Sequence, residues 1–324
     1  MSRPSLRLGF IPLNDCAPLA VASELGFFEA EGLDVSLSRE ASWANVRDKV
    51  AVGALQGAHM LAPLPLAMSL GVGSETVAME VPLGLSLNGS AITIAAAHAE
   101  AMRALDPEGM AARPCTARPL KKLIEAREAA GQPPLVFAVV FPYSMHNYEL
   151  RYWLAEAGID PDRDVRIVIT PPPRMAHRLK AGDIDGFCVG APWNAVAVAE
   201  GSGEILIYAS EVWRTGPDKA FGVTAAWSAA NPDTRRALLR ALLRAAVWAD
   251  EPANRADLAH MLAHPSYVDA PEEIVRLSLV GSPPYSLREP GGAASDPANS
   301  DPANQDYLIY HRYAAGFPWR SHAA

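Results

Sequence analysis

Short apolar segments alternate with amphipathic ones along residues 6–90, and this alternation limits the folds that the chain can adopt. The runs LRLGFI, LDVSLS and AHMLA have the length and composition of strands. The intervening segments at 16–31, 43–55 and 64–71 repeat apolar residues with the period of a helix. Strands that alternate with helices of this length form mostly parallel, doubly wound sheets. The sequence therefore predicts an α/β unit at its start.

The alternation restarts after a polar, proline-broken stretch at 98–119, which we interpret as a connection. The strand-like runs LVFAVV, VRIVIT, IDGFCV and EILIYA then alternate with further helical segments. We predict a second α/β lobe at 96–210, inserted into a first lobe made of 1–95 and 211–324. Two such lobes, joined by two extended crossings, describe a type II periplasmic-binding-protein fold with a ligand cleft between the lobes.

The region beyond residue 220 has a different character. The segment TRRALLRALLRAAVWAD is a predicted amphipathic helix with its arginines on one face. A tandem DPAN repeat at 296–304 lies in a stretch with the composition of a flexible loop. Several aromatic residues follow, and we predict that they dock on the body of the protein: Tyr307, Tyr310, Tyr313, Phe317 and Trp319.

The composition argues against several classes of function. The formal net charge of −8 disfavours nonspecific binding to nucleic acid or to anionic membranes. No apolar run reaches the ~18 residues that span a bilayer. Only five residues precede the first predicted strand, so we expect no removable leader and a cytoplasmic location. The cysteines Cys16, Cys115 and Cys188 are widely spaced and are predicted to be small buried residues.

No motif for catalysis, for a cofactor or for a metal is visible. The chain lacks a dinucleotide-binding glycine motif, a phosphate-binding loop, a zinc-protease motif and a nucleophile elbow. His146 and His177 lie far apart, with no paired carboxylates at metal-ligand spacing. We therefore predict a binding protein without a cofactor or a metal.

Trp43 begins a predicted helix in the stretch ASWANVRDKV, an unusual place for a large indole. Ser42 suits the N-cap, so Trp43 falls in the first turn, where free backbone N–H groups and the positive helix end favour an anion. An indole N–H donates and cannot accept, which also suits an anion. The alternative is a Trp43 that packs between the lobes or in a core. Arg47 and Lys49, one turn later, would add to the positive field.

His146 lies in the first turn of another predicted helix, in FPYSMHNYELRYWL. Ser144 is its predicted N-cap, with Glu149 available for the reciprocal bond of a capping box. The positive helix end disfavours an imidazolium, but a neutral imidazole still offers one N–H donor. The alternative is a structural histidine whose hydrogen bonds are satisfied within the protein.

Three further segments place polar or small residues at strand ends. In GPDKAFGVTAAW, Lys219 is the full positive charge that we place in the cleft, the alternative being an exposed hinge lysine. Asn88-Gly89-Ser90 would present backbone and hydroxyl donors where the chain crosses between lobes, or form a simple turn. Gly190 would let the backbone approach a ligand, or allow tight packing of a helix on a strand.

Taken together, these segments resemble the nitrate/bicarbonate-binding protein family, represented by NrtA and CmpA, and its soluble NasS branch. WANVRDK, MHNYELRYWL and GFCVG followed by PWN occur in the same order, and the similarity extends over residues 6–265. The resemblance implies an anion held between two lobes. By this resemblance, the residues that hold the anion in the nitrate-binding members correspond to Trp43, His146 and Lys219.

Two positions depart from the family pattern. Ser90 stands where the nitrate-binding members have a glutamine, so this shorter contact would pass through water or be replaced by backbone. Ala191 stands where the GEPWN version of the motif has a glutamate. The loss of that acid favours a bare anion over a bicarbonate or metal-bicarbonate complex.

The transport members carry a leader and a linker, and their apparent absence points to the NasS-like branch. That resemblance implies a cytoplasmic nitrate/nitrite sensor. In its ligand-free state the sensor would sequester a NasT-like ANTAR RNA-binding antiterminator of nitrate-assimilation genes, and nitrate would release this partner. The chain itself would then contact neither nucleic acid nor membrane.

Two alternatives stay open. One is the solute-binding component of an ABC-type nitrate or bicarbonate transporter. The other is an enzyme on the same fold, similar to a thiamin-pyrimidine synthase, which would need a reactive His/Cys arrangement and a cofactor site that the sequence does not show.

Overall fold

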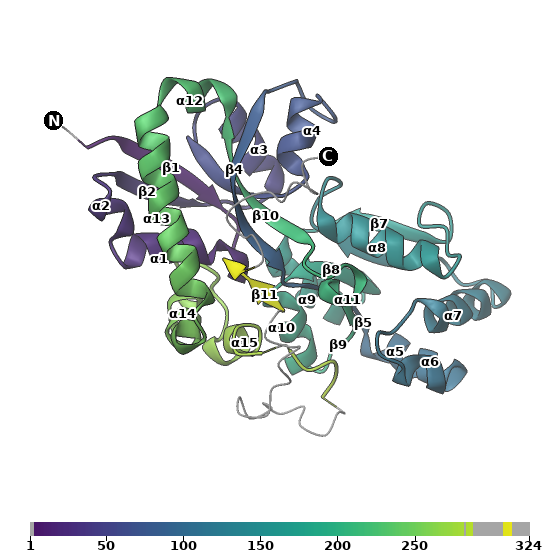
Figure 1. Ribbon diagram of the computed structural model, residues 1–324. Helices are drawn as coiled ribbons and strands as arrows, with labels where there is room; N and C mark the ends of the chain where they lie inside the picture. The colour runs from purple at the N-terminus through teal and green to yellow at the C-terminus, as the bar shows by residue number, and fades with distance from the viewer. Residues whose placement is uncertain (1–2, 282, 288–306, 313–324) are drawn as a thin grey trace.

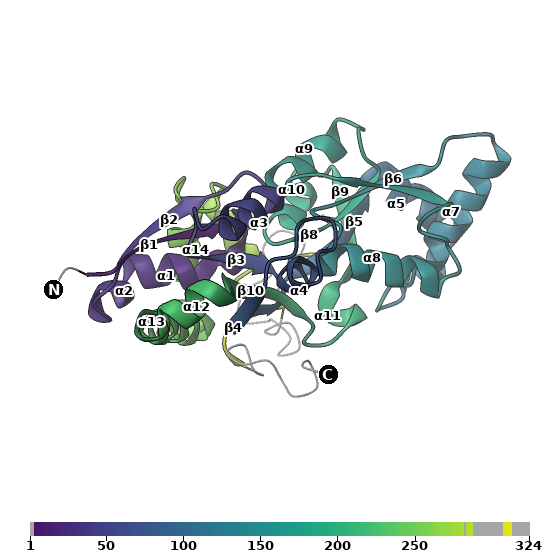
Figure 2. The same cartoon turned by 90° about the horizontal axis from the view of Figure 1, so that it is seen from above.

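The computed structural model describes residues 3–281, 283–287 and 307–312, and it shows two α/β lobes, each built on one sheet (Figures 1 and 2). The first lobe contains both ends of the described chain, and the second is inserted between β4 and β10. The predicted α/β class and the predicted insertion of one lobe in the other are both observed.

The sheet of the first lobe has six strands in the order β11-β4-β10-β3-β1-β2. The strands are β1 (Ser5–Phe10), β2 (Asp34–Arg39), β3 (Gly57–Leu61), β4 (Met79–Asn88), β10 (Pro217–Thr224) and β11 (Leu308–Ile309). β1 pairs in parallel with β2 and β3, whereas β10 runs antiparallel to β3 and β4. The sheet is therefore mixed, because the chain re-enters this lobe in the opposite direction.

Helices cover this sheet, and most of them occupy the predicted segments. They are α1 (Ala17–Glu24), α2 (Phe27–Ala30), α3 (Trp43–Ala51), α4 (Leu64–Ser69), α12 (Ala225–Ala230), α13 (Pro232–Asp250), α14 (Arg255–Ala263) and α15 (Glu272–Leu277), with 3-10 turns η1 (Asn14–Cys16) and η3 (Pro252–Asn254). The predicted helix at 16–31 is divided into two because Gly26 adopts a left-handed conformation with φ of 67°. The long α13 buries its alanine- and leucine-rich face and packs on α1.

The sheet of the second lobe has five strands in the order β7-β6-β8-β5-β9. The strands are β5 (Ser90–Ala95), β6 (Leu135–Val139), β7 (Val165–Ile169), β8 (Gly186–Gly190) and β9 (Gly203–Tyr208). The helices are α5 (Ala96–Leu105), α6 (Pro107–Ala111), α7 (Arg118–Ala129), α8 (Met145–Glu156), α9 (Met175–Lys180), α10 (Trp193–Ala199) and α11 (Ala209–Val212), with the 3-10 turn η2 (Pro172–Arg174).

The interpretation of 98–119 as a connection is wrong, since α5, α6 and the start of α7 occupy this stretch. Ala99 and Met102 bury one face of α5 against the second lobe's core. Asp106 caps α6 by accepting a hydrogen bond from Gly109 N at 3.1 Å. Two of the prolines that suggest a break, Pro107 and Pro119, stand in the first turns of helices, where no backbone N–H is needed, and Pro114 lies between α6 and α7.

The chain passes between the lobes at Asn88–Ser90, as predicted, but the second lobe begins earlier than expected. Asn88 and Gly89 adopt left-handed conformations with φ of 59° and 87°, and this turn redirects the chain from β4 into β5. β5 belongs to the second sheet, so the predicted boundary at residue 95 comes one strand too late. The return crossing lies between α11 and β10.

A short C-terminal segment, 307–312, docks on the first lobe and reaches the region between the lobes. Tyr310 is fully buried, and its hydroxyl donates to Asn14 O at 2.8 Å. Tyr307 is also buried and donates to Gly89 O at 3.2 Å. The predicted docking is thus observed for these two tyrosines. The DPAN repeat and Tyr313, Phe317 and Trp319 lie outside the described residues.

We expect Asp250→Ala to destabilise the protein by about 3–5 kcal/mol, because it breaks a buried ion pair and leaves the partner unpaired. Asp250 accepts from Arg255 Nη2 at 2.8 Å and from Arg312 N at 2.8 Å, which ties the C-terminal segment to α13. Urea unfolding of the variant measures the loss. Asp233→Ala removes an exposed acid on the same helix and should stay within about 0.5 kcal/mol of wild type. Equal stability of Asp250→Ala and wild type would contradict the expectation.

Candidate functional site

Trp43 lies at the start of α3, inside the protein rather than at its surface. Ser42 caps the helix as predicted, accepting a hydrogen bond from Asn45 N at 3.1 Å. The Trp43 side chain is buried beside His59, with ring centroids 5.4 Å apart. Its indole Nε1 has no hydrogen-bond partner in the protein. A buried donor without a partner costs free energy and needs a reason, so burial alone does not explain this residue.

His146 is completely buried at the start of α8, and neither ring nitrogen has a hydrogen-bond partner. Ser144 caps the helix as predicted, accepting from Asn147 N at 3.1 Å. Burial, and then the charge of Lys219, hold the His146 pKa well below its usual value, so the ring is neutral. The reading of a satisfied structural histidine does not fit a ring with two unpartnered nitrogens.

Glu149 does not complete a capping box with Ser144, contrary to the expectation. The third helical position of α8 is Asn147, and Glu149 lies two residues further along. Its buried carboxyl instead accepts a hydrogen bond from Ser90 Oγ at 3.2 Å. Burial, reinforced by the charge of Asp218, raises the pKa of Glu149 from 4.5 to about 8, so this acid holds its proton at neutral pH.

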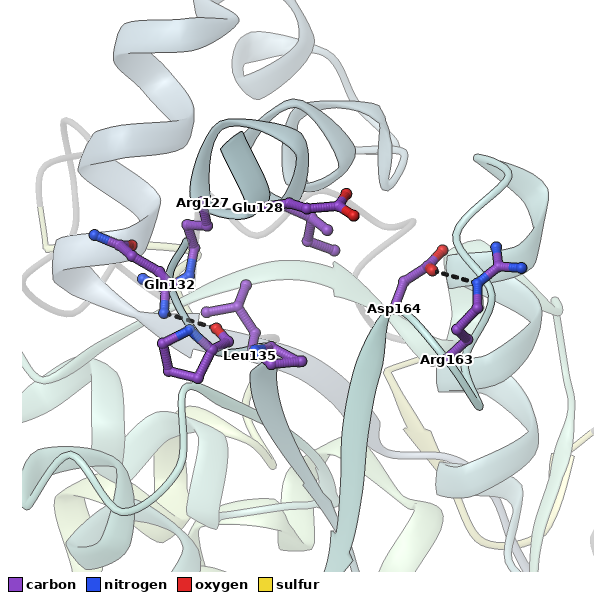
Figure 3. Close-up of a pocket in the computed structure, with 9 residues that line it drawn as sticks. Arg127, Glu128, Gln132, Leu135, Arg163 and Asp164 are labelled. Carbon is purple, nitrogen blue, oxygen red and sulfur yellow. Dashed lines mark hydrogen bonds and ion pairs between the residues drawn. The ribbon is translucent and has the colours of Figure 1, made fainter. Parts of the chain in front are cut away.

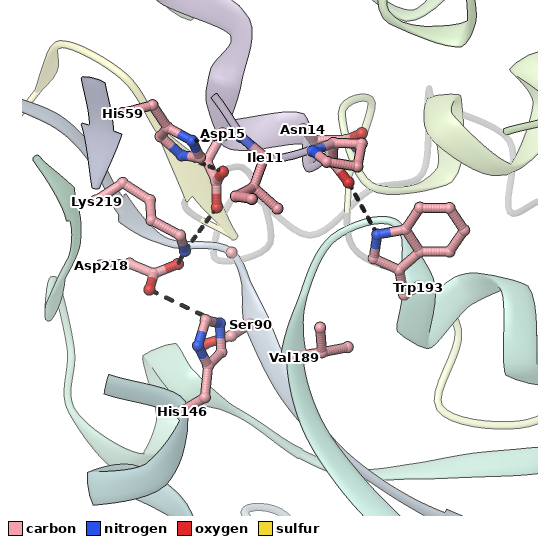
Figure 4. A network of polar contacts seen from close by, with 12 residues as sticks. Ile11, Asn14, Asp15, His59, Ser90, His146, Val189, Trp193, Asp218 and Lys219 are labelled. Atoms are coloured by element: carbon pink, nitrogen blue, oxygen red, sulfur yellow. Dashed lines mark hydrogen bonds and ion pairs between the residues drawn. The ribbon is translucent and has the colours of Figure 1, made fainter. Parts of the chain in front are cut away.

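Lys219 is buried in β10 and is not an exposed hinge lysine. Its ammonium Nζ lies 2.8 Å from Asp15 Oδ2 and 2.6 Å from Asp218 Oδ2 (Figure 4). Burial lowers the Lys219 pKa, but the two carboxylates outweigh it and raise the pKa above its usual value. The positive charge predicted for the cleft is therefore present, and two acids of the chain already contact it.

Asp218 and Lys219 are consecutive, yet both side chains reach the same cluster. Successive residues of a regular strand point to opposite faces of the sheet. The register of β10 against β4 shifts on both sides of Lys219, from Pro217 to Lys219 and from Lys219 to Ala220. Irregularities of this kind redirect side chains near functional sites. Here they let one strand place the Lys219 ammonium and the Asp218 carboxylate in the same cluster.

Asp15 and His59 complete the charged cluster, and neither is among the residues that the sequence predicts for the site. Asp15 in η1 contacts Lys219 and also lies 2.7 Å from His59 Nε2. Burial raises the Asp15 pKa, but Lys219 and His59 outweigh it, so the pKa is lowered and the acid is ionised. His59 Nδ1 accepts from Ile11 N at 3.4 Å, which leaves the Nε2 proton for Asp15. Asp15 follows the buried strand β1, a position that could have identified it as a site candidate, whereas His59 lies in the middle of β3.

Ser90 and Gly190 lie opposite each other where β5 pairs with β8. A Cβ atom added to Gly190 would stand 3.3 Å from Asp15 Oδ2 and 3.6 Å from His146 Nε2, so glycine lets the second lobe approach the cluster. Figure 4 shows Asp15, His59 and Lys219 from the first lobe facing His146 and Ser90 from the second. Trp43 packs against His59, and the Nζ of Lys219 lies 5.9 Å from the centroid of the Trp43 ring. The structure thus brings together all five residues predicted for the site: Trp43, Ser90, His146, Gly190 and Lys219.

Hydrogen bonds between the lobes hold them together around this cluster. Asn14 N donates to Ala191 O at 2.9 Å, and Trp193 Nε1 donates to Pro12 O at 3.0 Å. Ala191, the departure from the GEPWN motif, is buried at this seam. Trp43, His146 and Lys219 are each at most 1 % exposed. A ligand can therefore reach them only when the lobes separate, as in hinge closure of two-lobed proteins.

Arg47 and Lys49 do not add to the positive field of the cluster, contrary to the expectation. Lys49 Nζ pairs with Glu40 at 2.7 Å, and Arg47 Nε pairs with Asp48 at 2.7 Å. The Arg47 guanidinium also lies 5.9 Å from the ring centroid of Phe141 in the second lobe. Both charges are paired locally, and Arg47 also contributes a contact across the lobes.

A separate pocket of about 180 Å³ lies in the second lobe, between the end of α7 and the start of β6 (Figure 3). Among the charged side chains that line it, Arg127 Nη2 donates to Pro133 O at 3.1 Å, and Arg163 Nε pairs with Asp164 at 3.0 Å. None of the five predicted site residues lines it.

Among the described residues, no group of three or more histidine, cysteine or acidic side chains has the arrangement of a metal site. In the same part of the chain, no helix combines the length and hydropathy needed to cross a bilayer. The three cysteines are free and buried, as predicted.

The NMT1-like family matches residues 2–263, which is most of the chain. The chain belongs to this family. It is 39% identical to the nitrate import ATP-binding protein NrtC of Synechocystis sp. over 85% of its own length, but it covers only 39% of that protein. It is 33% identical to the nitrate/nitrite-binding protein NrtA of Synechococcus elongatus, covering 97% of this chain and 68% of that one.

The structure is similar to the crystal structure of the periplasmic nitrate-binding protein NrtA from Synechocystis. The TM-score is 0.86 at 29% identity, covering 98% of this chain and 78% of that one. This match confirms the predicted two-lobed binding-protein fold.

We expect Glu149→Gln to remove a pH dependence of stability. The folded protein keeps the Glu149 proton up to about pH 8, whereas the unfolded chain loses it above about 4.5. The free energy of unfolding should therefore fall as pH rises between these values, by about 1.4 kcal/mol per pH unit. Glutamine mimics the neutral acid, so the free energy of unfolding of the variant should rise relative to that of wild type from pH 5 to pH 8.

Urea unfolding at pH 5, 6, 7 and 8 measures the difference between the two proteins. Glu156→Gln, at the exposed end of α8, is the matched control and should follow the wild-type profile. Parallel profiles for Glu149→Gln and wild type would show that Glu149 is ionised in the folded protein.

Proposed function

We propose that the protein binds nitrate or nitrite between its lobes, at Trp43, His146 and Lys219, and that it acts without catalysis. The observation that carries this proposal is a set of buried donors without partners, the Trp43 indole and the His146 ring, beside a buried ammonium. Nitrate and nitrite accept hydrogen bonds and donate none, so they match such a set. The similarity to nitrate/nitrite-binding NrtA proteins supports the same ligand.

Each residue has a distinct role in this proposal. Lys219 supplies the charge, and hydrogen bonds from a charged donor are roughly twice as strong as neutral ones. Trp43 and neutral His146 supply directed N–H donors to the remaining oxygens. Asp15, held by His59, fixes the position of Lys219. Ser90 already donates to Glu149, so its contact with the ligand would pass through water, as its short side chain suggested.

We further propose that the protein serves import, as the solute-binding part of an ABC-type nitrate transporter. The similarity to NrtC and NrtA, named as import and binding proteins, favours this role over the sensor role. The NasS-like sensor, its NasT-like partner and the cytoplasmic location inferred from the sequence stay predictions.

The two roles differ in location and in partner. Fractionation of the native host, followed by a pull-down with and without nitrate, separates them. An importer component should copurify with a permease or an ATP-binding subunit. A soluble RNA-binding antiterminator that is captured only without nitrate would overturn the import role in favour of the sensor.

We expect Trp43→Phe to weaken nitrate binding roughly tenfold or more, since a hydrogen bond to a charged group is worth about 1.5–3 kcal/mol. Lys219→Met should reduce binding by more than about 100-fold, because both the charge and the donor are lost. Isothermal titration calorimetry with nitrate, nitrite, bicarbonate and sulfate measures these affinities.

Lys180→Met removes an exposed lysine that pairs with Glu200 and serves as the control, with unchanged binding. Circular dichroism and thermal melting establish that each variant is folded. Full nitrate affinity in folded Lys219→Met, or no binding of nitrate and nitrite to wild type, would exclude the proposed site.

A further inference from the structure

Asp218 lies where a bound anion would compete with it. Its Oδ2 is 2.6 Å from Lys219 Nζ, and its Oδ1 faces His146 Nε2 at 3.9 Å without a hydrogen-bond partner (Figure 4). A carboxylate is planar and presents oxygen acceptors, as nitrate and nitrite do. A side chain of the protein therefore already contacts one of the three proposed ligand groups and faces another.

The charges in the cluster do not favour a further anion while Asp218 is ionised. Lys219 contributes one positive charge and contacts two acids, Asp15 and Asp218. Asp15 stays ionised because Lys219 and His59 together outweigh the effect of burial. Burial raises the pKa of Asp218 to about 6, since the opposing attraction of Lys219 is offset by the charge of Asp15. Of these two acids, Asp218 is the one that can take up a proton near neutral pH.

The other titratable groups that face Asp218 from the surrounding elements do not take up a proton near neutral pH in its place. Burial holds the pKa values of His59 on β3 and His146 on α8 below their usual value, so both rings are neutral. Burial also keeps three other groups protonated at neutral pH: Glu149 on α8, Cys188 on β8 and Tyr307 of the C-terminal segment.

We propose that Asp218 determines anion specificity, as an internal anion that must be protonated before an oxyanion without a proton can bind. Nitrate or nitrite would bind together with one proton from solvent, which is transferred to the Asp218 carboxylate. The new O–H then donates to the ligand. Bicarbonate carries its own hydroxyl, which can donate to ionised Asp218 without proton uptake. This inference rests on the proposed function and adds the residue that distinguishes the two ligand classes.

Calorimetry with nitrate between pH 5.5 and pH 7.5 tests the inference. Wild-type affinity should fall roughly 20-fold across this range, as expected for one group of pKa about 6 that must be protonated. Titrations at pH 7.5 in buffers of different ionisation enthalpy should show nearly one proton taken up for each nitrate. This readout needs no variant.

Asp218→Asn, which is neutral at every pH and similar in shape, should bind nitrate without proton uptake and with a flat pH profile. At pH 8 its nitrate affinity should exceed that of wild type by roughly 100-fold. Its selectivity for nitrate over bicarbonate should rise by at least about tenfold at the same pH. Glu156→Gln, an exposed acid at the end of α8 and outside the cluster, is the control and should retain the wild-type pH profile between pH 5.5 and pH 7.5.

The outcomes separate this inference from the proposed function. Wild-type nitrate binding that is independent of pH, or weaker nitrate binding by folded Asp218→Asn, would overturn the role of Asp218 alone. No nitrate or nitrite binding to wild type at any pH would overturn the proposed function, and the inference with it.

Discussion

The buried contact of Lys219 with Asp15 and Asp218 is the interaction on which the arrangement of the site depends. An isolated ammonium inside a protein is very costly, so a buried lysine requires acids at hydrogen-bond distance. Asp15 comes from the turn after β1, and Asp218 and Lys219 come from the returning strand β10. This contact therefore fixes the start of the chain against the strand that re-enters the first lobe.

The second lobe completes the cluster with neutral groups rather than charges. His146 is uncharged, Glu149 is protonated, and Gly190 brings backbone close to Asp15 without a side chain between them. Closing the lobes thus buries one positive charge with its two acids and adds donors without partners. The result is a site whose polar atoms are held in place by the fold and are not all satisfied by it, as expected for a preorganised binding site.

Much of this arrangement could be predicted from sequence because the signals are local. The sequence predicts Ser42 and Ser144 as helix caps, and both make the expected hydrogen bonds. The helices at 96–111 were missed because prolines and polar residues resemble a linker when their capping role is not known. The position of Asp15 after β1 is a local signal, but its contact with Lys219 joins distant segments, and the orientation of Asp218 depends on an irregular strand, which no local pattern reveals.

The most direct test of the account observes the Trp43 indole itself. In ¹⁵N-labelled protein, its N–H signal, assigned with Trp43→Phe, should shift downfield and saturate as nitrate is added, because a free donor gains an acceptor. The Trp153 indole already donates to Cys115 O at 2.9 Å inside the second lobe and should not move. Nitrate binding that leaves the Trp43 signal unchanged would contradict an anion site built on this residue.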